Sequence, residues 1–136
     1  MKSYFLLYLS VLLFGCGRQV DIPEVLAVYP TSDVLPENLL RMYIQFSQPM
    51  KTIGNIEKIK LTDEFGEEVE NVFFNNVHEL WNKEQTQLTL ILDPARVKTG
   101  LKAKEALGRA IRRGENYTLT IADLEDVYHQ KMGTVF

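Results

Sequence analysis

The chain has 136 residues, of which 46% are hydrophobic and 24% are charged, and its formal net charge is −3. This length and composition allow one ordinary globular domain. The slightly negative charge argues against nucleic acid as a partner. The chain has one cysteine, which excludes a disulfide framework.

The N-terminal residues have the organisation of an export signal. Lys2 is a short positive region, and an apolar run over residues 4–14 follows it. This run is too short to span a bilayer comfortably. It ends in Leu13-Phe14-Gly15-Cys16, which resembles the lipobox of bacterial lipoproteins, with an aliphatic residue three before the cysteine and a small residue directly before it. The resemblance implies cleavage before Cys16 and lipidation of its thiol and new amino group.

The alternative is a plain signal peptide, or an anchor, with an incidental cysteine. Lipidation is favoured because an unpaired thiol is otherwise a liability in an exported protein. Lipid on Cys16 would hold the protein on a membrane of the bacterial cell envelope, on the periplasmic or the surface face. We therefore predict a signal peptide over residues 1–15, a tether over 16–22 and a folded domain over 23–136.

Short runs of alternating apolar and polar residues, separated by turns, predict an all-β domain. The predicted strands are Val25–Tyr29, 39–46, a segment around Ile59 and Leu61, 69–74, 86–92 and 116–121. The strand at 69–74 is expected to form a hairpin with its predecessor across the turn at 63–66. Asp93 as N-cap and Pro94 at the first helical position predict one helical turn near residues 94–99. Residues 123–132 are expected to be a polar connection.

The inward-facing positions of these strands predict the core. They are Leu40, Met42, Ile44, Phe46, Leu88, Leu90, Leu92, Tyr117, Leu119 and Ile121. Trp81 is the only tryptophan, and we expect it in the core or at its rim because aromatic side chains bury the largest areas. A carbohydrate-stacking role is the alternative for Trp81.

The strand endings resemble a known family. Val28-Tyr29-Pro30, Pro36 and the run Ile44-Gln45-Phe46-Ser47-Gln48-Pro49-Met50 are similar to the bacterial Ig-like modules of S-layer and other surface proteins, which close their second strand with "F-S-x-P-M". The segment 116–121 is similar to their penultimate strand. This resemblance covers about residues 25–122 and implies an antiparallel Ig-like β-sandwich. It implies little about function, because such sandwiches carry unrelated functions.

Between residues 72 and 111 the chain is longer than a plain module of this kind. Insertions on a rigid scaffold are where binding sites usually lie. The candidate binding surface is therefore drawn from polar, aromatic and basic residues of this region and of the basic loop that runs on to Arg113: Asn75, Asn76, His78, Trp81, Arg96, Lys98, Arg109, Arg112 and Arg113. The basic members suit an anionic glycan, a lipid headgroup or an acidic envelope protein. The alternative is an ordinary solvated surface.

No nucleophile elbow, P-loop, dinucleotide fingerprint or zinc spacing is present, so we expect neither an enzyme nor a cofactor. Periplasmic copper-binding sandwiches share a related pattern, and His78 and His129 with Met50 or Met132 would be the ligands in such a protein. The acidic run around 63–70 lacks the spacing of a calcium loop. The expected function is a membrane-anchored, non-catalytic binding or structural module. The alternatives are an accessory domain of a larger exported enzyme and a copper-binding sandwich.

Residues 133–136 resume an apolar alternation at the point where the sequence stops. A sandwich of this type closes with a strand beside the one that ends near Ile121, and strands usually have about 5–6 residues. We therefore predict that the closing strand is incomplete in this sequence. The alternative is a short but genuine final strand.

Overall fold

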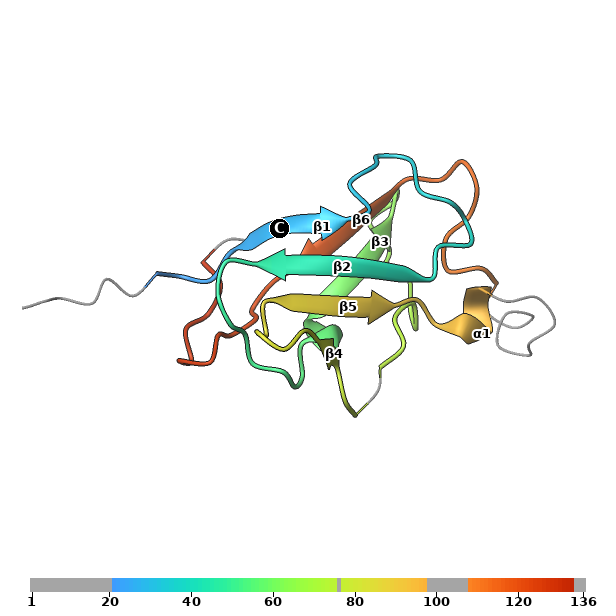
Figure 1. Cartoon of the computed structure of the whole chain (residues 1–136). Helices are drawn as coiled ribbons and strands as arrows, with labels where there is room; N and C mark the ends of the chain where they lie inside the picture. The colour runs from blue at the N-terminus through green and yellow to red at the C-terminus, as the bar shows by residue number, and fades with distance from the viewer. Residues whose placement is uncertain (1–20, 76, 98–107, 134–136) are drawn as a thin grey trace, which may run out of the picture.

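The computed structural model describes residues 21–75, 77–97 and 108–133 (Figure 1). In this part of the chain, nearly all regular structure is β-strand, which confirms the prediction of an all-β fold. The elements are β1 (Val25–Tyr29), β2 (Arg41–Phe46), the 3₁₀ turn η1 (Ile56–Lys58), β3 (Ile59–Asp63), β4 (Leu80–Trp81), β5 (Gln87–Ile91), α1 (Pro94–Val97) and β6 (Tyr117–Ile121). No helix among the described residues is long and apolar enough to cross a membrane.

The strands form two antiparallel sheets. One has the order β1-β2-β5-β4, and the other consists of β3 and β6. Figure 1 shows the four-stranded sheet in front, with β3 and β6 crossing behind it. In the front sheet Val28, Ile44, Leu88 and Trp81 are successive register partners, so they share its inner face.

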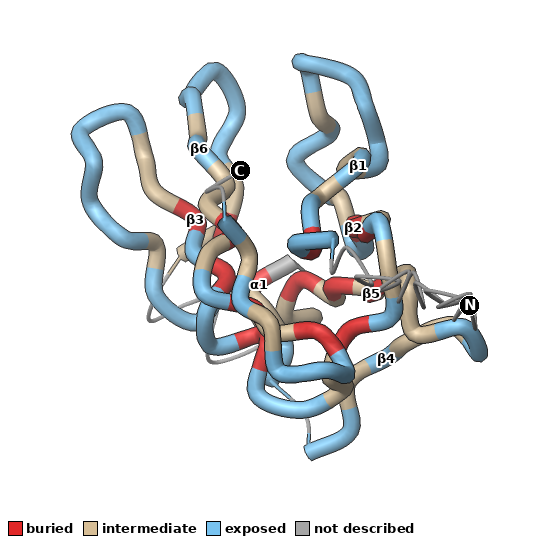
Figure 2. The backbone as a smooth tube through the Cα atoms, turned by 90° about the vertical axis from the view of Figure 1, so that its left-hand side faces the viewer, coloured by how far each residue is buried: buried red, intermediate tan, exposed pale blue. Residues whose placement is uncertain are grey.

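The inner faces of the two sheets meet in one core. Figure 2 shows buried stretches on both sheets, along β2 and β5 on one side and β3 on the other. The buried core residues include Met42, Ile44, Phe46, Leu88, Leu90 and Leu92 from the front sheet, and Ile59, Leu61 and Ile121 from β3 and β6. Burying one such side chain contributes about 1.5–3 kcal/mol. The alternation in the sequence therefore identified the core face of β2, β5 and β6.

Three members of the predicted core need correction. Leu40 is 45% exposed, because β2 begins at Arg41 and Leu40 lies where the sheets open at their end. Tyr117 and Leu119 are only partly buried, and they pack against the edge of the core. All three line the same opening between the sheets.

The strand predicted at 69–74 is wrong. This segment starts beside β3, where the Val69 amide donates to the Leu61 carbonyl at 2.8 Å. It ends beside β5, where the Phe74 amide donates to the Ile91 carbonyl at 2.8 Å. Because the segment passes from one sheet to the other, it pairs only briefly with each. The hairpin turn at its start is present, since the Asp63 amide donates to the Glu67 carbonyl at 2.9 Å.

The helical turn is confirmed as α1, and its N-cap is formed as predicted. The Ala95 amide donates to Asp93 Oδ1 at 2.8 Å, which satisfies one of the free amides at the start of the helix. The end predicted for this turn near residue 99 lies outside the described residues, as do the last three residues of the predicted closing strand.

The segment 123–132 is more than the polar connection predicted. Leu124 and Asp126 are fully buried. The Asp126 carboxylate accepts hydrogen bonds from the Tyr128 and Gln130 amides at 2.9 and 2.7 Å, and from Gln48 Nε2 at 2.6 Å. These bonds form a tight turn and fix it to the chain after β2.

Candidate functional site

The two ends of the sheets differ, and each carries a candidate site. The chain enters at Glu24, whose amide donates to Ser47 Oγ at 2.9 Å, directly after β2. The turn 82–86 lies at the same end, because the Phe46 amide donates to the Thr86 carbonyl at 2.8 Å. We call this the tether end. The opposite end, where β2 begins and β5 ends, is called the cleft end.

At the cleft end a cleft of about 1350 Å³ opens between the two sheets. Its floor is apolar and comes from both sheets: Leu40, Met42, Leu61, Val72, Phe73, Leu92, Ile111 and Leu119. Its rim is formed by the loops 33–38 and 109–116. Small-molecule pockets usually have about 300–1,000 Å³ and apolar walls. This cleft is larger than most of them, and it is open enough for a segment of polypeptide.

Charges of both signs surround the cleft. Arg109 Nη1 lies 3.1 Å from Glu37 Oε1, and Arg112 Nη1 lies 3.6 Å from Glu115 Oε1. Arg113 is exposed on the same rim. The predicted basic surface is thus present at Arg109, Arg112 and Arg113, but acidic side chains neutralise part of it.

Tyr117 joins this rim to the floor of the cleft. Its hydroxyl donates to Glu115 Oε2 at 2.7 Å and accepts from the Arg112 amide at 3.0 Å. Burial, together with the hydrogen bond to Glu115, raises the pKa of Tyr117. The phenol therefore stays neutral and holds the loop before β6 in place.

Arg96 does not belong to an exposed binding surface, which corrects the prediction for this residue. It is 5% exposed, and its guanidinium donates to the carbonyls of Glu70, Gly108 and Arg109, the last two at 3.3 and 3.4 Å. Burial lowers its pKa from the ordinary value. Arg96 thus joins α1 to the Glu70 carbonyl, 26 residues earlier, and to the carbonyls of Gly108 and Arg109, 12 and 13 residues later.

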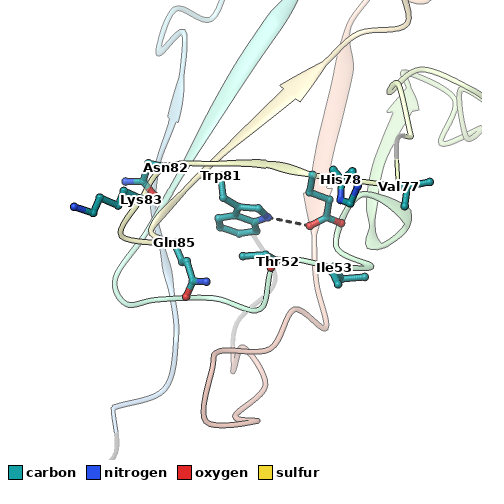
Figure 3. A pocket seen from close by; sticks show the side chains of 9 residues that line it. Thr52, Ile53, Val77, His78, Trp81, Asn82, Lys83 and Gln85 are labelled. Carbon is teal, nitrogen blue, oxygen red and sulfur yellow. Dashed lines mark hydrogen bonds between the residues drawn. The ribbon is translucent and has the colours of Figure 1, made fainter.

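At the tether end a pocket of about 290 Å³ surrounds Trp81 (Figure 3). Ile53 and Val77 lie to one side of Trp81 in this view, and Asn82 and Lys83 to the other. The ring packs on Phe46 with 5.6 Å between the ring centroids. Trp81 is partly buried against the core, which confirms its predicted place at the core rim.

Glu79 organises this pocket, and sequence reasoning missed it. Its carboxylate accepts hydrogen bonds from Trp81 Nε1 at 3.0 Å, Asn55 Nδ2 at 2.7 Å, the Ile56 amide at 3.1 Å and the Asn55 amide. Asn55 is 2% exposed and also donates to the Lys51 carbonyl at 2.7 Å. One carboxylate therefore joins β4 to a loop 23–24 residues earlier in the chain.

The remaining residues of the predicted binding surface lie in different parts of the molecule. His78 is exposed and lines the Trp81 pocket. Asn75 is exposed and donates to Glu57 Oε1 at 3.2 Å. Cys16, Asn76 and Lys98 lie outside the described residues. The single binding surface predicted from the sequence is therefore split between the two ends of the sheets.

The described residues include no group of three His, Cys, Asp or Glu side chains that could hold a metal ion. Of the residues considered for a copper site, His78 and His129 are exposed and Met50 is fully buried. The chain matches no protein-family model and no curated protein.

Proposed function

We propose that the chain is a lipid-anchored, non-catalytic Ig-like module of the bacterial cell envelope, and that it holds a β-strand of a partner protein in its cleft. The observation that carries this proposal is the cleft, with an apolar floor supplied by both sheets. The part of this floor that water reaches comes from Leu40, which is 45% exposed, and from the partly buried Phe73, Ile111 and Leu119. Apolar area left open to water is costly. An occupant with apolar side chains would cover it.

The strand order supports an Ig-like arrangement. In the constant-type Ig fold, strands A, B, E and D form one sheet and C, F and G the other. The order β1-β2-β5-β4 corresponds to A-B-E-D, and β3-β6 corresponds to C-F. No third strand pairs with β6 in the described part of the chain. A strand beside β6 would take the place of G and cover Tyr117 and Leu119.

A protein strand suits this position better than an anionic glycan. One edge of β6 has no partner strand among the described residues. The backbone N–H and C=O groups of such an edge pair with an added strand, while its alternate side chains enter pockets. The arginines of the rim are partly neutralised by Glu37 and Glu115, which weakens the attraction for a polyanion. The apolar floor gives a glycan little to bind.

The position of the tether supports an anchored module. Lipid on Cys16 would lie at the tether end, since the chain enters beside Ser47. The cleft opens at the opposite end of β2. The anchor therefore leaves the cleft accessible to a partner.

Site-specific photo-crosslinking in cells tests the proposal. A photoreactive residue at Val34, which is 83% exposed and lines the cleft, should form a crosslink to an envelope protein. The matched control is Leu26, which is 61% exposed on β1 and outside the cleft lining. Equal products at the two positions, or none at Val34, would contradict strand capture in the cleft.

The anchor is tested separately with Cys16→Ala. This variant should leave the membrane fraction, or accumulate as uncleaved precursor, because the site of lipid attachment is gone. Identical fractionation and migration of the variant and the wild type would show that Cys16 is not lipidated.

A further inference from the structure

Three strongly exposed apolar side chains lie on loops along one side of the molecule, and Val34 and Phe65 are as exposed in other places. Ile53, Val77 and Tyr128 are 79%, 82% and 69% exposed, and they belong to three separate loops. Figure 1 shows the loops around residues 50–55, 77–79 and 126–130 extending from the lower side of the molecule. Scattered single apolar residues are ordinary on protein surfaces. Three loop tips of this kind on one side form a surface that favours an apolar partner.

Hydrogen bonds hold these loops in place. Glu79 fixes the loop before η1 to β4. The Asp126 turn is joined to the chain after β2, since the Lys51 amide donates to the Glu125 carbonyl at 2.9 Å and the Val127 amide to the Pro49 carbonyl at 3.1 Å. The loops that carry Ile53 and Tyr128 are therefore held in place, and docking these two side chains would cost little conformational entropy.

Some of the polar groups around Trp81 are already used within the protein, and the side chains of Thr52, His78, Lys83 and Gln85 complete the pocket lining. Trp81 Nε1 donates to Glu79. The Asn82 side chain accepts from the Thr86 and Gln87 amides at 2.8 and 2.9 Å and donates to Thr86 Oγ1 at 3.1 Å. The exposed apolar side chains of Ile53 and Val77 at this pocket favour an apolar or interfacial partner over a glycan.

The tether limits how far this surface can lie from the membrane. Cys16 precedes Asp21 by five residues, and an extended chain spans at most about 3.3–3.6 Å per residue. A lipid on Cys16 thus keeps Asp21 within roughly 20 Å of the bilayer. Trp and Tyr prefer the membrane interface, where one part of the ring is apolar and the other is wet.

We propose that the loop tips at Ile53, Val77 and Tyr128 dock on the bilayer that carries the lipid of Cys16, with Trp81 in the pocket that Ile53 and Val77 line. This inference rests on the proposed lipidation. Basic and acidic side chains are about equally frequent around these loops: Lys51, Lys83 and Lys131 against Glu79, Glu84 and Glu125. Docking is therefore apolar, and it should depend little on salt concentration.

Trp81 reports on docking directly, since it is the only tryptophan. The full lipidated protein is reconstituted into phosphatidylcholine vesicles with brominated acyl chains, which quench a nearby indole. We expect quenching in the wild type and its loss in Ile53→Ser/Val77→Ser. The matched control is Val34→Ser, an equally exposed valine at the cleft end, which should be quenched like the wild type. A urea melt checks that the double variant remains folded.

The outcomes separate the two proposals. Protein that sediments with the vesicles but shows no quenching in the wild type overturns docking and leaves the anchor in place. Equal quenching of the double variant overturns the role of the loop tips. Protein that carries no lipid overturns both proposals. An emission change with envelope polysaccharide, but none with vesicles, would make the pocket a glycan site and overturn docking.

Discussion

Replacing Glu79 with alanine should destabilise the domain far more than the same replacement of the exposed Glu84. The carboxylate accepts four hydrogen bonds, from the Asn55 amide, Asn55 Nδ2, the Ile56 amide and Trp81 Nε1. Asn55 is 2% exposed, so in Glu79→Ala its N–H donors cannot form hydrogen bonds with water instead. A buried donor left without a partner costs about 1–3 kcal/mol. Water can replace the acceptor for Trp81, which borders the pocket.

The expected loss is therefore about 2–4 kcal/mol, a large part of the roughly 5–15 kcal/mol that a domain has. Urea unfolding followed by Trp81 fluorescence measures it as a lower midpoint at constant slope. Glu84→Ala, at an exposed position five residues later, is the matched control and should stay within about 0.5 kcal/mol of the wild type. Equal losses in the two variants would refute the argument that Glu79 joins the loop to β4.

Other variants test the remaining structural claims. Phe46→Ala should cost about 3–5 kcal/mol in the same urea assay, whereas Arg41→Ala on the exposed face should cost less than about 1 kcal/mol. Arg96→Ala should lower the unfolding free energy by about 1–3 kcal/mol, because three backbone carbonyls lose their donor. An unchanged unfolding free energy would contradict a structural role for Arg96. The hydrogen bond from Lys51 lowers the pKa of Glu125, so this pair stabilises the fold above the carboxyl's ordinary pKa of 4.5 and loses that effect as the pH falls. Lys51→Met should therefore flatten the acid side of a melting-temperature profile between pH 7 and pH 3, and an unchanged profile would contradict the assignment.

The strands with one buried and one wet face were predictable from the sequence. In β2 and β5 each inward position is large and apolar, and each outward position except Ile91 is polar or amphipathic, so a shift by one residue would expose the core. The N-cap of α1 was predictable for a similar reason, since Asp93 and the amide it accepts from are two residues apart. Signals of this kind are local, because all the residues that produce them lie within one segment of the chain.

The contacts that build the two candidate sites are not local. Glu79 meets Asn55 across 24 residues, and Gln48 meets Asp126 across 78. Neither carboxylate belongs to a motif, so nothing nearby in the sequence distinguishes them from solvated surface residues. Arg96 shows the same limit, because its burial depends on three carbonyl oxygens that the fold brings together. The segment 69–74 has the composition of a strand, yet it crosses from one sheet to the other and forms only a short stretch of pairing with each.

The proposed roles of the two ends are coupled by geometry. At about 3.3–3.4 Å per residue, the six residues of β2 separate the tether end from the cleft end by roughly 20 Å. Docked loop tips would keep the cleft at one height and one orientation above the bilayer. A partner anchored in the same membrane would then meet the edge of β6, which has no partner strand in the described part of the chain, at a higher effective concentration and without any added contact in the cleft. It follows that removing the apolar loop tips should weaken crosslinking at Val34 while the cleft itself is unchanged.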